Sequence, residues 1–83
     1  MGTMSDHQES EHFAYNRTWE DIERMLRKAE AKQNYWISEF YMARSLNDRR
    51  RMKEAARNKK ALEGVIKTLR WTLGDKNVEH PLE

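Results

Sequence analysis

Hydrophobic side chains recur at alternating steps of three and four residues along two long stretches of the chain. This is the heptad spacing of a helix that buries one side. In the first stretch, the positions with this spacing are Trp19, Ile22, Leu26, Ala29, Gln33, Trp36, Phe40 and Ala43. In the second, they are Met52, Ala55, Lys59, Leu62, Ile66, Leu69 and Leu73. The pattern predicts an all-α protein with two long amphipathic helices.

The ends of both helices can be placed from local chemistry. Thr18 followed by Asp21 has the form of a helix N-cap, and Gly74 suits a left-handed C-terminal cap. The hydrophobic spacing breaks between Ala43 and Met52 and restarts two residues out of phase. We therefore predict helices at 18–46 and 48–73, with a turn near 45–49.

A single continuous helix is the alternative to this hairpin. It would continue the first hydrophobic spacing through four polar residues: Asn47, Arg50, Glu54 and Arg57. The antiparallel hairpin is preferred because the spacing restarts out of phase at Met52 and because Ser45-Leu46-Asn47-Asp48 supplies turn and N-cap chemistry. Folding at Asn47 pairs Phe40 with Ala55. It also places Lys59 opposite Trp36, where either a cation–π contact or a lysine stem lying across the ring is expected.

Two helices alone bury little surface, so the hairpin is expected to assemble further, into a dimeric four-helix bundle. Hydrophobic residues outside the contact between the helices support this expectation. The predicted interface residues are Tyr35, Ile37, Tyr41, Met42 and Trp71. The alternative is that these side chains cover the hairpin's own edges or pack against Phe13 and Tyr15.

The remaining segments are expected to be tails. Residues 1–17 are read as a flexible acidic tail and residues 75–83 as a C-terminal tail; residues 1–3 and 82–83 are interpreted as cloning remnants. The chain has no cysteine, which leaves the redox compartment open. It has no apolar run of membrane-spanning length and no signal-peptide pattern, so a cytoplasmic protein is expected.

Catalytic chemistry finds little support in the sequence. The three histidines, His7, His12 and His80, all lie in the tails, and the glycines form no phosphate-binding loop. We therefore expect no enzyme activity, no metal site and no cofactor.

Charge is unevenly distributed although the net charge is only +2. Basic residues gather at the start of the second predicted helix: Arg49, Arg50, Arg51, Lys53, Arg57 and Lys60. Such a cluster is sufficient for contacts to a phosphate backbone, which leaves nucleic-acid binding physically open. Two alternatives are a solvated basic face and a charged end that sets the register of the dimer.

Residues 61–75 followed by His80-Pro81-Leu82 resemble the C-terminal part of small uncharacterised helical proteins of bacteriophages. The resemblance implies a phage accessory protein that acts on a host factor in the host cytoplasm. Some phage antagonists of nucleotide-signalling immunity are also oligomeric helical hairpins that sequester cyclic nucleotides, a similarity of architecture alone. The leading hypothesis is a non-enzymatic interaction protein. Nucleic-acid binding is the alternative, and sequestration of a small nucleotide is a third hypothesis.

Overall fold

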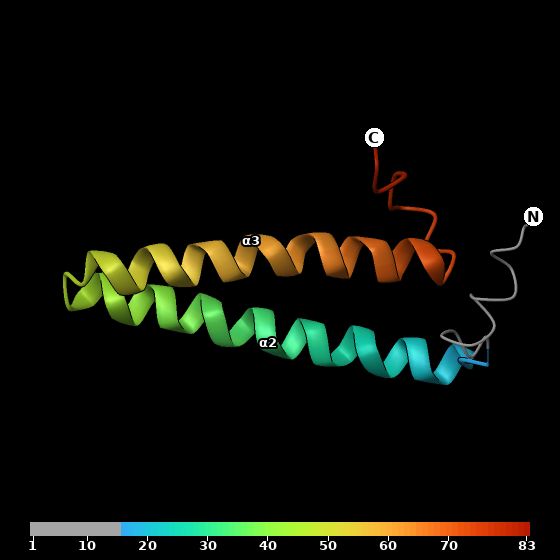
Figure 1. Cartoon of the computed structure of the whole chain (residues 1–83), viewed down its shortest axis with the longest axis horizontal. Helices are drawn as coiled ribbons and strands as arrows, with labels where there is room; N and C mark the ends of the chain where they lie inside the picture. Colours follow the sequence, from blue (N-terminus) through green and yellow to red (C-terminus); the bar gives the residue numbers. More distant parts are fainter. Residues whose placement is uncertain (1–15) are drawn as a thin grey trace, which may run out of the picture.

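The computed structural model describes residues 16–83, which form an antiparallel hairpin of two long helices (Figure 1). Helix α2 spans Trp19–Ser45 and helix α3 spans Arg49–Thr72. The two helices pack against each other along their length, and the described part of the chain contains no strand. The prediction of an all-α fold with two packed helices is confirmed. Neither helix has an apolar stretch that could cross a bilayer.

A reciprocal pair of hydrogen bonds starts α2. The Thr18 hydroxyl accepts the backbone N–H of Asp21 at 3.1 Å, and the Asp21 carboxylate accepts the backbone N–H of Thr18 at 3.1 Å. Both N–H groups belong to the first turn of the helix, where no backbone carbonyl can reach them. The capping role predicted for Thr18 is confirmed.

The turn between the helices ends one helix and begins the next within three residues. The backbone N–H of Asp48 donates to the carbonyl of Ala43 at 2.9 Å, and that of Asn47 donates to Arg44 at 3.1 Å. This pairing requires a left-handed residue, and Asn47 has φ 57°. The Asp48 carboxylate then accepts the N–H of Arg51 at 3.1 Å and caps α3. The polar residues of the turn therefore satisfy both helix ends without a glycine.

Helix α3 ends with the same motif, built on glycine. Gly74 has φ +87°, its N–H donates to Trp71 at 3.0 Å, and the N–H of Asp75 donates to Arg70 at 3.0 Å. The glycine cap predicted from the sequence is confirmed. Beyond it the chain turns back beside α3, where the rings of His80 and Trp71 meet edge to face with centroids 5.2 Å apart.

The core between the helices is thin. Within residues 16–83 the buried hydrophobic side chains are Ala29, Ala43, Ala55 and Ile66. The large residues of the predicted hydrophobic spacing, such as Leu26, Trp36 and Phe40, are only half-buried. The helices therefore meet along the predicted line, but a single hairpin does not enclose its aromatic side chains.

Two positions of the predicted line lie outside the core. Trp19 is 63% exposed, because α3 ends at Thr72 and the chain turns away at Gly74, leaving no turn of α3 opposite it. Lys59 is exposed as well, and its ammonium lies 3.9 Å from the Glu63 carboxylate, one turn further along α3. The sequence analysis was wrong to place Trp19 in the contact between the helices.

Candidate interaction surfaces

The hairpin has two long flanks, one on each side of the contact between α2 and α3. An ion pair crosses each of them: Arg70–Glu30 at 2.6 Å and Arg51–Glu39 at 3.3 Å. Glu30 and Glu39 are nine residues apart on α2, about two and a half turns, and so point to opposite sides. We call the side of Glu30 flank A and the side of Glu39 flank B.

Flank A contains an apolar groove between the helices. Its lining residues are Ile37, Phe40, Tyr41, Ala56, Lys59 and Glu63. The rings of Phe40 and Tyr41 lie edge to face, with centroids 5.6 Å apart and an interplanar angle of 87°. Tyr41 is nevertheless 59% exposed. The groove therefore combines a half-buried aromatic floor with an exposed aromatic wall and a charged rim.

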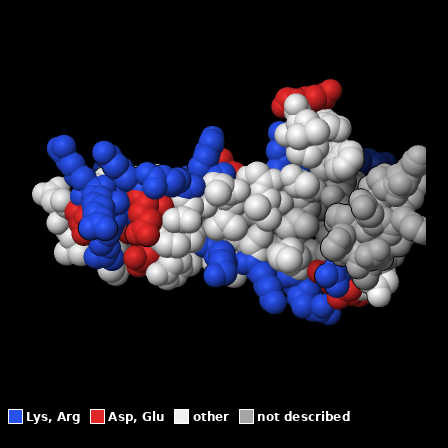
Figure 2. Space-filling model, viewed as in Figure 1, with Lys and Arg blue, Asp and Glu red and all other residues white. Residues whose placement is uncertain are grey.

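Flank B also carries exposed apolar side chains. Tyr35 and Met42 are 56% and 54% exposed and lie within one turn of Glu39 on α2. The same side carries Met25 and Leu46 on α2 and Val65 on α3, all exposed. Figure 2 shows that an uncharged stretch covers the middle of the face in view, beyond the basic side chains at the turn.

The five predicted interface residues do not form one surface. Ile37 and Tyr41 belong to flank A, whereas Tyr35 and Met42 belong to flank B. Trp71 lies against His80 of the C-terminal segment and is 46% exposed. The heptad position of each residue would have separated the two flanks in the sequence.

Two exposed side chains were missed by the sequence analysis. Leu46 follows Glu39 by seven residues and Met25 precedes it by fourteen, so both lie on flank B. The signal that could have found them is this spacing of seven. Neither residue belongs to the aromatic stretch in the middle of α2, which includes Tyr35 and Tyr41.

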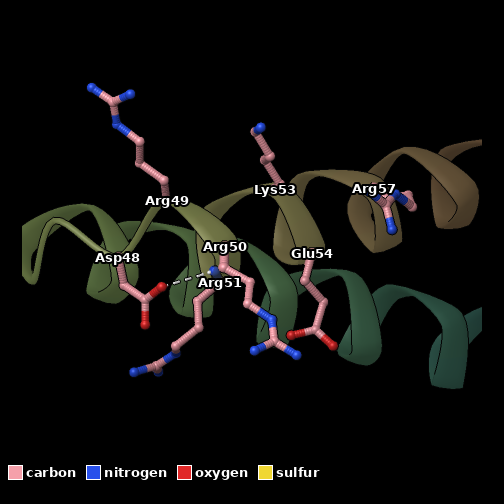
Figure 3. Close-up of a pocket in the computed structure, with 7 residues that line it drawn as sticks. All are labelled: Asp48, Arg49, Arg50, Arg51, Lys53, Glu54 and Arg57. Carbon is pink, nitrogen blue, oxygen red and sulfur yellow. Dashed lines mark hydrogen bonds between the residues drawn. The ribbon is translucent and has the colours of Figure 1, made fainter.

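The basic residues at the turn lie around one depression, together with two acids. The lining residues are Asp48, Arg49, Arg50, Arg51, Lys53, Glu54 and Arg57 (Figure 3). Lys60 is not among them, and its ammonium lies 3.7 Å from Glu63. The structure thus brings together five of the six basic residues that the sequence singled out.

These basic side chains differ in what they already bind. The Arg51 guanidinium lies 3.3 Å from the Glu39 carboxylate, so it joins the two helices. Within residues 16–83, no carboxylate lies within 4.0 Å of the cationic groups of the other four, which are Arg49, Arg50, Lys53 and Arg57. Within the described part of the chain, these four charges therefore stay available to an external anion.

At the opposite end of the hairpin, Asp21 is held in its charged form. The hydrogen bond from the Thr18 backbone N–H, and then the contact with Arg24 at 2.9 Å, lower the pKa of Asp21 below its usual value of 3.8. A charged carboxylate at this position also suits the positive end of the helix dipole. Its role is therefore to stabilise the start of α2.

Of the histidines and the tail aromatic residues named from the sequence, His80 alone lies within the described residues. His7, His12, Phe13 and Tyr15 lie outside the described residues. His80 packs against Trp71, and its Nδ1 atom accepts the backbone N–H of Leu82 at 3.2 Å. His80 therefore organises the C-terminal segment.

No family model matches the chain, and no curated protein or solved structure is significantly similar to it. The resemblance to phage proteins accordingly stays a prediction.

Proposed function

We propose that this chain is a non-enzymatic interaction protein that pairs with a second copy through flank A, forming a dimeric four-helix bundle that binds a macromolecular partner. The observation that carries the proposal is the thin core: no described side chain larger than Ile66 is buried. The resemblance to phage proteins suggests a host macromolecule as the partner.

A second hairpin on flank A would bury what the first leaves open. Phe40 is only half-buried and Tyr41 is 59% exposed, and both border the groove. Fully burying a large apolar side chain contributes about 1.5–3 kcal/mol. Covering the groove therefore completes the burial of the aromatic residues that the hairpin presents on this side.

The rim of the groove favours a copy of the same chain as the occupant. Lys59 and Glu63 lie next to each other on α3, so the rim carries both signs of charge. In a two-fold symmetric dimer each patch meets itself, and Lys59 of one copy can face Glu63 of the other. A surface with balanced charge is self-complementary, whereas a partner of one charge sign would meet a repulsive group at the rim.

Sedimentation equilibrium tests the assembly. The chain has a mass of 10.0 kDa, so the dimer has twice that mass. The double variant Ile37→Ala/Tyr41→Ala should weaken association on the order of 10²-fold, because central aromatic and aliphatic contacts dominate interface energy.

The matched control is Tyr35→Ala/Met42→Ala, which removes a tyrosine about as exposed as Tyr41, and an exposed methionine, from flank B. It should leave the dimer intact. A wild-type protein that stays monomeric at high concentration would refute the proposal. If only the control variant loses the dimer, the interface lies on flank B and the assignment to flank A is wrong.

A further inference from the structure

We propose that the outer ridge of α3 at the turn binds the phosphate backbone of a nucleic-acid duplex, independently of base sequence. The outer ridge is defined by four residues: Arg49, Arg50, Lys53 and Arg57. The proposal goes beyond self-association and does not depend on it. Only Arg49 shares the side of α3 on which Ala56 of the flank A groove lies, and Ala56 is about 10 Å further along the axis.

The ridge follows one side of the helix. Arg49, Lys53 and Arg57 are spaced by four residues, so each is rotated by about 40° from the last, and together they span about 12 Å along the axis. Ala55 is buried against α2 and lies two residues from Arg57, nearly half a turn away. The side of α3 that carries Arg57 therefore faces away from the hairpin.

The four ridge cations are available to phosphate groups. None has a carboxylate partner within 4.0 Å among residues 16–83, unlike Arg51 and Lys60. Of the two acids nearby, Asp48 accepts the backbone N–H of Arg51, and Figure 3 shows Glu54 pointing away from Arg49 and Lys53. Three of the four side chains are arginines, which bind phosphate oxygens in a bidentate manner.

The surroundings of the ridge favour a duplex backbone over other anionic partners. Leu46 is exposed at the turn, but no large apolar side chain is exposed between it and Val65, so the ridge itself carries none that could insert into a lipid surface. No aromatic residue lines the depression, so bases of a single strand have no ring on which to stack. A duplex offers the densest row of phosphates and needs only charge contacts.

Salt dependence gives a quantitative test with the full chain. Fluorescence anisotropy with a labelled DNA duplex of random sequence should give a Kd on the order of 10⁻⁶ M at about 50 mM salt. Four phosphate contacts predict a slope of about −3.6 in log K against log salt, and so a roughly 150-fold loss of affinity between 50 and 200 mM. A matching RNA duplex in a parallel titration shows which nucleic acid is preferred.

Two double variants test the residues. Lys53→Ala/Arg57→Ala should reduce the slope to about −1.8, which is a loss of only about 12-fold over the same salt range. Arg49→Ala/Arg50→Ala should do the same. All four side chains are exposed, so each variant should keep its helices, which circular dichroism checks.

The matched control is Lys28→Ala/Lys32→Ala, which removes two exposed charges from α2. It should leave the slope unchanged. The proposal is overturned if the wild-type protein does not bind the duplex at about 50 mM salt. It is also overturned if the control variant reduces the slope as much as the ridge variants do. Tighter binding to anionic lipid vesicles, or displacement of the duplex by equimolar free nucleotide, overturns it as well.

Discussion

Enlarging Ala43 should disrupt the contact between the helices more than any surface change. Ala43 and Ala55 are both fully buried, at 0% exposure, on either side of the turn. The short link through Asn47 draws α2 and α3 together there, and the side chain buried on each side of the turn is an alanine methyl group. The substitution Ala43→Leu puts an isobutyl group into this space.

The cost follows from close packing. Extra methylene groups in a packed site force side chains from their rotamers or push the backbones apart, at about 1–3 kcal/mol. For a chain of this size, each kcal/mol lowers the melting temperature by about 4–8 °C. A decrease of roughly 5–20 °C is therefore expected for Ala43→Leu.

Thermal and urea unfolding, followed by circular dichroism at equal protein concentration, measure the effect. Equal concentration matters because association raises the apparent stability. Ala31→Leu is the matched control, since Ala31 is exposed on the same helix and the change should stay within about 0.5 kcal/mol. If Ala43→Leu is as stable as Ala31→Leu, the helices do not approach closely at the turn and the reasoning is wrong.

Two further predictions concern the helix ends. Asn47 has φ 57°, so Asn47→Ala should destabilise the hairpin by about 1–2 kcal/mol in urea unfolding, whereas Asn47→Gly should be tolerated; equal midpoints for the two variants would contradict this. The pKa of Asp21 is lowered, chiefly by the Thr18 backbone N–H, so its carboxylate stabilises the fold fully above pH 3.8 and loses this effect as the pH falls through the lowered pKa. The melting temperature, measured at decreasing pH, should show this loss of stability in wild type and in Glu23→Gln but not in Asp21→Asn. If Asp21→Asn shows the same loss, the assignment to Asp21 is wrong.

The parts of the fold that were predicted well depend on neighbours in the sequence. The Thr18 cap and the Gly74 cap each satisfy backbone groups a few residues away, so residue type and spacing are enough to place them. Trp19 shows the limit of this reasoning. It has the correct spacing to face α3, but it is exposed because α3 ends before reaching it.

The candidate sites were predicted only in part, because the sequence shows which residues are neighbours along one helix but not which contacts join the two helices. The sequence grouped the basic residues, since they are neighbours along α3. It did not separate Arg51 from the others, because the partner of Arg51 is Glu39, twelve residues away on the other helix. Likewise, it did not divide Tyr35 from Tyr41, although the two flanks on which they lie follow from their positions relative to the contact between the helices.

The sequence by itself determined that this protein is helical, where its helices begin and end, and which side of each helix is apolar. These properties arise from hydrogen bonds and side-chain spacing within a turn or two. Only the tertiary structure decided which charges of the described residues remain free and how far each aromatic ring is covered. Both depend on how α2 and α3 are placed against each other, because a cation is neutralised, or a ring covered, by residues of the opposite helix.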